Sequence, residues 1–373
     1  MIKYHLFLII GFSFCINAIG QVFTNREIDP LDSLARVSAK KKEYPYALPI
    51  LGKKAVAAGF DLPYSAGMSV QYFTQTSDII LENLKVGFNG GEMIDLSGLV
   101  KFDLAKARAS ALTFRPDVWV FPFLNVYGIL GRAQASTEVK YRVDAPEDIT
   151  NNVPILSGAS LVEFQTTTYG FGVMPAIGIK GAFLILDMNI AWTDVPQLSR
   201  PTRTFVIGPR LGKNFKLKKP EQSIAVWVGG FRVSLDAASE GSLPLNEALD
   251  VDEWGGRIDA AGNKVAAGQV KVDTWWASLS PIEQRNPLNI ARYNAANRAL
   301  ATAGKLVEAA DNAINTAASS TVEYSLDRRP DDPWNFLTGM QYQFNKHWML
   351  RLEAGYFSSR TQFVCGVQYR FGL

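Results

Sequence analysis

The final stretch of the chain, WMLRLEAGYFSSRTQFVCGVQYRFGL (348–373), alternates apolar and polar side chains in two segments joined by a short polar turn. Successive side chains of a β-strand point to opposite faces, so the pattern predicts two paired strands, each with one apolar wall. On the last strand that wall is rich in aromatic residues up to the end of the chain, where order is normally lost. Ordered pairing of the terminal strand is therefore expected.

The segment WNFLTGMQYQFN (334–345) repeats the alternation. A soluble β-sandwich also alternates, so two further features decide between the architectures. Aromatic residues lie near both ends of the apolar faces, as in the interfacial girdles of membrane barrels. The other face carries Arg351, Glu353 and Arg370 on neighbouring strands, which a dry core would not tolerate without full pairing. We therefore predict an all-β fold, a transmembrane antiparallel up-and-down β-barrel.

Residues 1–20 have the layout of a secretory signal peptide, with a polar start and the apolar run LFLIIGFSFC (6–15). That run is too short to span a membrane as a helix, and no later run is longer. After cleavage one cysteine, Cys365, would remain, so no disulfide framework is expected. The formal net charge of +3 provides no basic field for nucleic acid.

Breaks in the alternation divide the chain into about ten strands, and a hairpin formed by residues 21–63 would raise the count to twelve. Short links at FPF (121–123), KG (180–181), KKPE (218–221) and NKH (345–347) fall on one side, as periplasmic turns do. We expect a signal peptide at 1–20, a periplasmic segment at 21–63 and an outer-membrane barrel at 64–373, with a helical extracellular insertion at 236–333. The predicted strands are 65–88, 92–119, 124–142, 163–179, 182–195, 202–217, 223–235, 334–345, 348–358 and 361–373.

The insertion contains a helix start at SPIE (280–283), where Ser280 is the N-cap and Glu283 completes a capping box. An Ala-rich run follows with a small-residue stripe at helical spacing. We expect a helical hairpin lying across the barrel mouth as a lid; a ligand-binding lid or a partner surface are the alternatives. Trp275 and Trp276 either anchor the insertion at the barrel rim or lipid interface, or pack within it. The stripe comprises Leu288, Ala291, Ala295, Ala299, Ala303 and Leu306.

Two charged runs, DVDEW (250–254) and RRPDD (328–332), lack the ordered ligand spacing of a calcium loop and are interpreted as solvated loop charges.

The face opposite the apolar stripe predicts the lining of the lumen, with four arginines and three acids. These side chains form either a closed core of Arg–carboxylate pairs or a path that attracts anionic solutes. The facing of Arg132 and Arg232 is ambiguous, so they are left out. The predicted luminal network is Gln71, Arg115, Asp117, Asp187, Asn189, Arg210, Gln341, Gln343, Arg351, Glu353, Gln368 and Arg370.

The last strand resembles the C-terminal assembly signal of Gram-negative outer-membrane barrels, with Tyr369, Phe371 and Leu373 in its apolar positions. The resemblance implies recognition by the barrel assembly machinery. The chain is also similar to a widespread, functionally uncharacterised family of Gram-negative outer-membrane barrels, through RPDVWVFPFLNVYGILG (115–131), IGPRLG (207–212) and 332–363. That family implies fold and location but no activity.

The chain has two histidines: His5 leaves with the signal peptide, and His347 falls in a periplasmic turn. No residue can thus act as the histidine base that outer-membrane hydrolases generally use, so an enzyme is not expected, and neither is a metal site or other cofactor. We expect a narrow passive conduit or gated transporter for a small solute. The alternative is a non-conducting structural or surface-binding barrel. The expected partners are outer-membrane lipid, the assembly machinery and a small solute, with no nucleic acid.

Overall fold

The computed structural model describes residues 44–144, 154–179, 181–196, 198–219, 221–236, 238–245, 251–316, 320–357 and 359–373. The predicted signal peptide (1–20) and residues 21–43 lie outside the described residues. None of the described helices is long and apolar enough to cross a bilayer.

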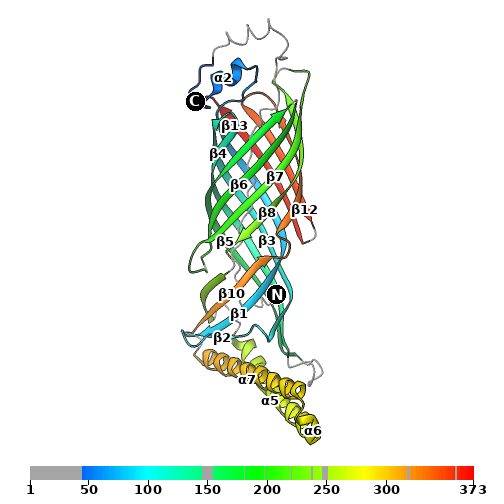
Figure 1. Ribbon diagram of the computed structural model, residues 1–373. Helices are drawn as coiled ribbons and strands as arrows, with labels where there is room; N and C mark the ends of the chain where they lie inside the picture. The colour runs from blue at the N-terminus through cyan, green and yellow to red at the C-terminus, as the bar shows by residue number, and fades with distance from the viewer. Residues whose placement is uncertain are drawn as a thin grey trace.

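Ten antiparallel strands form a closed barrel, because the first and last strands pair along twelve positions from Ala66↔Phe371 to Ser77↔Arg360. Each strand follows its neighbour in sequence except where a long insertion separates the seventh from the eighth (Figure 1). The up-and-down barrel with about ten strands is thus confirmed. The barrel strands are β1 (Ala66–Phe88), β3 (Val100–Phe121), β4 (Leu124–Asp144), β5 (Pro154–Ile179), β6 (Ala182–Asp194), β7 (Thr202–Lys216), β8 (Ser223–Leu235), β11 (Trp334–Gln343), β12 (Trp348–Phe357) and β13 (Arg360–Phe371).

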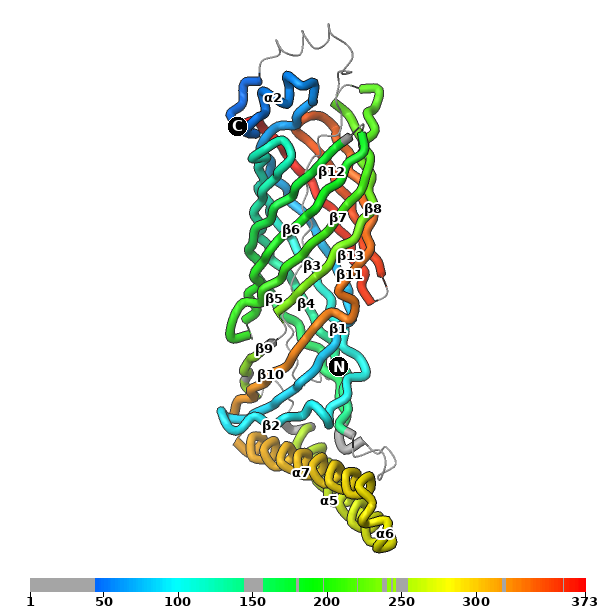
Figure 2. Tube along the Cα trace, in the orientation of Figure 1, coloured from blue at the N-terminus to red at the C-terminus, as the bar shows by residue number. Residues whose placement is uncertain are grey.

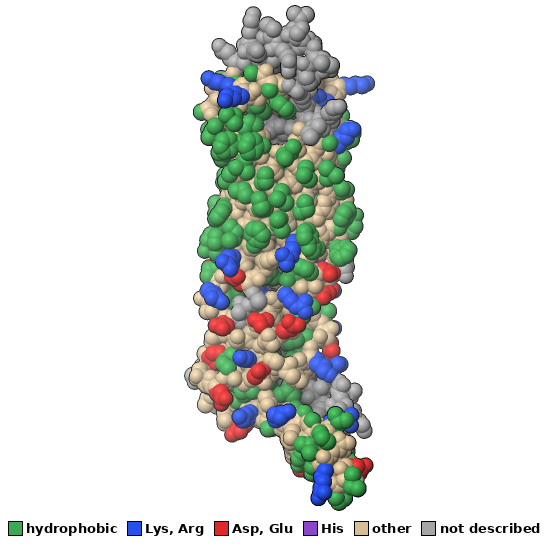
Figure 3. All heavy atoms as spheres, in the orientation of Figure 1, with side chains coloured by type: hydrophobic (Ala, Val, Ile, Leu, Met, Phe, Trp, Pro, Cys, Tyr) green, Lys and Arg blue, Asp and Glu red, His purple; other side chains and the backbone are tan. Residues whose placement is uncertain are grey.

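On the face shown in Figure 3, apolar side chains cover one half of the barrel and charged side chains occupy the surface beyond it. A belt of exposed apolar residues around a closed barrel is the lipid-facing surface of a transmembrane β-barrel. The exposed apolar side chains include Val70, Tyr72, Leu112, Phe114, Leu130, Tyr169, Phe171, Ile177, Leu184, Phe205, Leu211, Val228, Phe336, Tyr356, Phe363 and Val367.

Four strands extend beyond this belt. β1, β3, β4 and β5 have 21 to 26 residues, whereas about 9–11 suffice to cross a membrane. At Ile79 strand β1 leaves β13 and pairs instead with β10 (Thr321–Pro330), which in turn pairs with β9 (Ala238–Pro244). A short strand, β2 (Ile94–Asp95), also pairs with β1. These strands build an extension on the side opposite the chain's C-terminus (Figure 2).

The insertion is therefore not wholly helical, as its two ends are the strands β9 and β10. Between them, α5 (Val251–Ser278), α6 (Pro281–Gln284) and α7 (Pro287–Asn315) form a hairpin. The capping box of Ser280 and Glu283 is confirmed. The run DVDEW is not a loop: α5 begins at Val251, and Trp254 is buried.

The base of the hairpin covers the apolar end of the extension. Trp254 and Ile258 of α5 and Ala313 of α7 form one cluster with Tyr141 and Val322 of the strands. The tip points away from the barrel (Figure 1), so the hairpin caps the extension rather than lying across the mouth at membrane level.

The helix–helix contact uses a different stripe from the predicted one. α7 buries Ala296, Leu300, Ala303, Ala310 and Ala313, whereas Leu288 is 72% exposed. Leu300 faces Gly268 of α5, where an added Cβ would meet Leu300 Cδ2 at 3.0 Å. The two stripes share Ala303, and Ala299 and Leu306 are partly buried beside it, whereas the first half of the predicted stripe is exposed. Trp276 stacks on Tyr293 with ring centroids 4.4 Å apart, so it packs within the hairpin and not at the barrel rim.

The end of the barrel that holds the C-terminus is covered by the described part of the N-terminal segment, which adds a helix, α2 (Gly52–Ala57), and no barrel strand. The backbone amide of Ile50 donates to Val120, and that of Leu48 donates to Leu373. His347 lies in the turn before β12, where its Nδ1 is 2.8 Å from the carbonyl oxygen of Arg370.

Candidate functional site

The candidate site is the lumen, where charged side chains from opposite walls meet. Arg210 of β7 contacts Asp187 of the adjacent β6 at 3.2 Å and Glu353 of β12 at 3.3 Å. Glu353 also accepts from Arg351 at 2.6 Å. Strands β8 and β11 lie between β7 and β12, so the Arg210–Glu353 pair crosses the interior rather than following the wall.

Two aromatic side chains extend this network. The Tyr127 hydroxyl donates to Asp187 at 2.5 Å, and the Trp227 indole N–H donates to Glu353 at 3.1 Å. Both rings lie over glycines of neighbouring strands: a Cβ on Gly172 would come within 2.2 Å of the Tyr127 ring, and one on Gly339 within 2.3 Å of Trp227. Glycine is required at these two positions because the rings occupy the space of a side chain.

A second cluster lies nearer the end of the barrel that holds the C-terminus. Asp117 accepts hydrogen bonds from Gln368 at 2.6 Å and from Asn125 at 2.8 Å, and it forms an ion pair with Arg370 at 3.1 Å. Arg115 lies with its guanidinium carbon 4.0 Å from the centroid of the Tyr127 ring, so it links the two clusters. Such a cation–π contact stabilises an arginine side chain that has no carboxylate partner.

The buried charges do not balance. Among the described residues, six arginines and three carboxylates are buried. The three carboxylates all belong to the network just described, and it contains four of the arginines. The remaining two, Arg328 and Arg360, lie at the end of the barrel that adjoins the extension.

Both of these arginines have guanidinium nitrogens without a hydrogen-bond partner. Arg360 Nε donates to Ser77 at 3.3 Å, while its Nη1 is unpaired. Arg328 donates through Nη2 to Thr202 at 2.6 Å, while Nε and Nη1 are unpaired. Burial lowers the pKa of Arg328 to about 10, despite Tyr324 and Asp236 acting in the opposite direction, so it is charged at neutral pH.

Neutral polar side chains at the same end are also unpaired. Gln75 and Gln362 are register partners on β1 and β13. The amide oxygen of Gln75, and both amide atoms of Gln362 and of Asn335, are buried without a partner. This end of the lumen, defined by Gln75, Arg328, Asn335, Arg360 and Gln362, is called the rim.

Between the rim and the charged network part of the lining is apolar. Phe73, Phe231, Leu337 and Val206 are buried in one cluster. The Arg360 guanidinium carbon lies 5.9 Å from the Phe231 ring centroid. The lumen thus has a polar rim, a partly apolar middle and a charged half nearer the C-terminus.

All twelve residues of the predicted luminal network are buried. The structure joins Asp187, Arg210, Arg351 and Glu353 in one cluster and Asp117, Gln368 and Arg370 in another, with Arg115 between them. The amides lie farther from the charges: Gln71 donates to Ser69, Gln341 to the Met349 sulfur and Gln343 to the Glu221 carbonyl. Arg132 and Arg232 are exposed on the outer face.

The sequence interpretation missed several luminal residues. Arg328 was assigned to solvated loop charges in RRPDD, but it is an inward position of β10 and only its neighbour Arg329 is exposed. Arg360 begins β13 one residue before the predicted start, and its alternation with Gln362 would have placed it inside. Tyr127 and Trp227 lie on the two strands whose facing was ambiguous.

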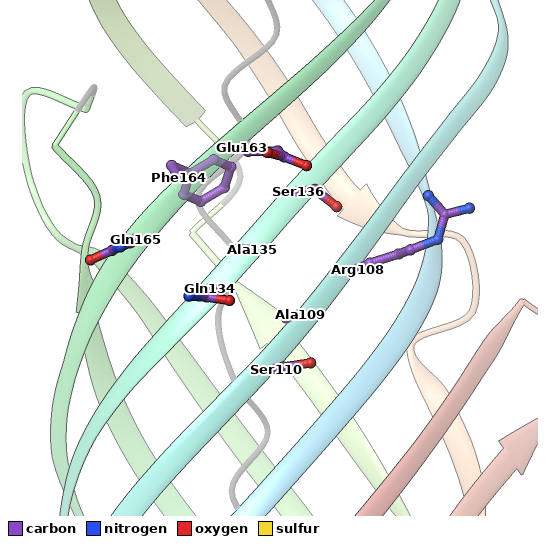
Figure 4. Close-up of a pocket in the computed structure, with 9 residues that line it drawn as sticks. All are labelled: Arg108, Ala109, Ser110, Gln134, Ala135, Ser136, Glu163, Phe164 and Gln165. Atoms are coloured by element: carbon purple, nitrogen blue, oxygen red, sulfur yellow. The ribbon is translucent and has the colours of Figure 1, made fainter.

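A separate pocket of about 460 Å³ opens on the outer face of β3, β4 and β5 (Figure 4). Arg108, Ser136 and Glu163 are register partners across these strands, and their side chains alternate with buried Ala109, Ala135 and Phe164. The pocket therefore lies outside the lumen. Arg108 is already paired with Glu138 at 3.2 Å.

The described residues contain no group of histidine, cysteine and carboxylate side chains that could hold a metal ion.

No family model and no curated protein matches this chain. The β domain of the Bordetella autotransporter BrkA is 9% identical over 82% of this chain and 100% of its own length, with a TM-score of 0.34. An outer membrane channel from Pseudomonas putida F1 is 9% identical over 83% and 96%, with a TM-score of 0.27. A Pseudomonas aeruginosa FadL homologue is 8% identical over 94% and 98%, with a TM-score of 0.26. At these values the likenesses carry no argument about function.

Proposed function

We propose that this protein is an outer-membrane conduit for a small solute, closed at rest by the charged network in its periplasmic half. The apolar belt and closed barrel support the location, and the C-terminal strand with Tyr369, Phe371 and Leu373 is proposed as the signal for the assembly machinery.

The observation that carries the proposal is the set of buried polar atoms without a partner in the lumen, which lie at the rim and also beside the charged network, as at Arg115 and Asn125. A buried donor or acceptor without a partner costs roughly 1–3 kcal/mol, so a sealed core would not retain several of them. The unpaired atoms of Gln75, Asn335 and Gln362 are therefore expected to bind water in the lumen. Water along the lumen is what a solute path requires and what a purely structural barrel does not need.

The network supplies the closure. A ten-stranded barrel is only slightly wider than an eight-stranded one, whose interior is filled by side chains. The Arg210–Glu353 contact spans that interior, and Arg351 and Trp227 fill the space beside it. Parting these ion pairs would open a path, and the hairpin at the far end of the extension would control access to it.

The test is planar-bilayer conductance of the refolded mature protein and of two variants. Glu353→Gln removes the carboxylate shared by two arginines. The second variant replaces residues 246–319 by a short turn, because the Leu245 amide donates to the Ser320 carbonyl and the ends already meet. We expect rare openings in the wild type and more frequent ones in both variants. Absence of conductance in all three folded proteins would contradict the proposal.

A second candidate function is a non-conducting barrel that binds a partner through the helical hairpin. It is favoured by exposed apolar residues near the hairpin tip: Val270 is 65% exposed and Ile282 is 84% exposed. Under this alternative the hairpin deletion abolishes partner binding and leaves conductance at zero.

A further inference from the structure

We propose that the rim binds a small organic anion, with its carboxylate on Arg328 and Arg360 and an apolar body directed toward Phe231. This inference rests on the proposed function and specifies the class of solute.

The charge of the rim is the first argument. Arg360 is 3% exposed and its described polar contact is with the Ser77 hydroxyl, while Arg328 is 2% exposed and contacts the Thr202 hydroxyl. Neither arginine is within ion-pairing distance of a carboxylate among the described residues. Two buried guanidinium groups on one wall attract an anion, since buried charges are normally paired.

Their spacing is the second argument. Ser77, the partner of Arg360, and Leu81, the partner of Arg328, are four residues apart on β1. That separation is about 13 Å along a strand, and arginine side chains are long enough for both to approach one anion between them. Nε and Nη1 of Arg328 point to different sides of the guanidinium, so each is free to donate a single charge-assisted hydrogen bond to a carboxylate oxygen.

The lining below the rim indicates what the rest of the ligand is. Phe231, Phe73 and Leu337 are apolar and buried, and the Phe231 ring lies beneath the Arg360 guanidinium. An inorganic anion would leave this surface without a partner. A carboxylate attached to an aromatic or short aliphatic body contacts both levels.

The measurement is equilibrium dialysis of benzoate against the full mature protein in detergent, with benzylamine as the cation of matched size and inorganic phosphate as the anion without an apolar body. Benzoate should bind, benzylamine should not, and phosphate should bind more weakly than benzoate. Arg360→Met and Arg328→Met should each weaken benzoate binding about 10-fold, the loss of one charge-assisted hydrogen bond. Arg108→Met, on the outer face, is the matched control and should leave binding unchanged.

Phe231→Ala should weaken benzoate binding and leave phosphate binding unchanged, with Leu337→Ala as the second variant if the first does not fold. Benzoate binding that survives loss of both arginines would overturn the inference. Phosphate binding as tight as benzoate binding would overturn the apolar part of it. Conductance recorded on the same samples separates the two proposals. If the barrel conducts but benzoate binding does not depend on the two arginines, only the proposed anion site is wrong. If benzoate binds but the barrel does not conduct, only the proposed conduit is wrong.

Discussion

Arg210 of β7 reaches Glu353 of β12 across the lumen, with Nε 3.3 Å from Oε2 and both side chains almost fully buried. A pair between strands that are not neighbours ties opposite walls together. Removing one partner leaves a buried charge uncompensated, which costs more than the pair itself contributes.

Glu353→Gln is therefore expected to lower the free energy of unfolding by about 3–5 kcal/mol. The double variant Glu353→Gln with Arg351→Met should lose less than the sum of the two single changes, because it removes one of the orphaned charges. Urea unfolding of the refolded barrel measures both. Arg108→Met, at an exposed ion pair, should change stability by less than about 1 kcal/mol. If the two variants Glu353→Gln and Arg108→Met lose equal free energy of unfolding, the buried network does not stabilise the barrel as proposed.

Gly172→Ala should displace Tyr127, because the new Cβ would lie 2.2 Å from its ring. We expect destabilisation of about 1–3 kcal/mol from overpacking, together with loss of the Tyr127–Asp187 hydrogen bond. Gly98→Ala is the control, since nothing lies within 4 Å of its added Cβ. Adding Tyr127→Ala to Gly172→Ala should relieve the clash; if Gly172→Ala matches Gly98→Ala in urea unfolding, the ring does not lie over the glycine.

The helical hairpin offers a matched pair of leucines. Leu300 is buried against α5 and Leu288 is exposed, although the sequence suggested the reverse preference. Leu300→Ala should cost about 2–5 kcal/mol of hairpin stability and Leu288→Ala should cost almost nothing. Thermal melting followed by the helical circular dichroism signal separates the two. A larger shift for Leu288→Ala would show that the helices pack through the stripe predicted from sequence.

The rim should depend on pH through Arg328. Its lowered pKa of about 10 means that the charge is lost as pH rises through that value. A carboxylate probe stays ionised well above its pKa of about 4. Benzoate affinity should thus be constant from about pH 6 to pH 9 and fall near pH 10, and Arg328→Met should remove that decline. A decline of the same size in Arg328→Met would assign it to another group.

The barrel could be predicted from sequence because strand alternation has a period of two and membrane strands repeat it ten times. The extension could not be predicted, because residues Ile79 to Phe88 continue the alternation of β1. No local feature of the sequence indicates that the pairing partner of β1 changes there from β13 to β10. Arg328 was misassigned for the same reason: β10 is short, and its pairing depends on a partner more than two hundred residues away. The side chains that face the lumen could be predicted on strands with one clearly apolar face. The facing was ambiguous in β4 and β8, whose inward Tyr127 and Trp227 are themselves aromatic.

We propose that the half of the lumen at the rim holds water while the charged network closes the half nearer the C-terminus. The most direct test of this proposal is labelling with a small, water-soluble thiol reagent in a Cys365→Ser background. Gln75→Cys, at the inward-facing rim, should react when the reagent is added from the extracellular side. Thr74→Cys, its outward-facing neighbour in the lipid belt, and Ser69→Cys, inward but beside the network, should not react. Equal protection of Gln75→Cys and Thr74→Cys in the folded protein would show a sealed lumen and contradict the account.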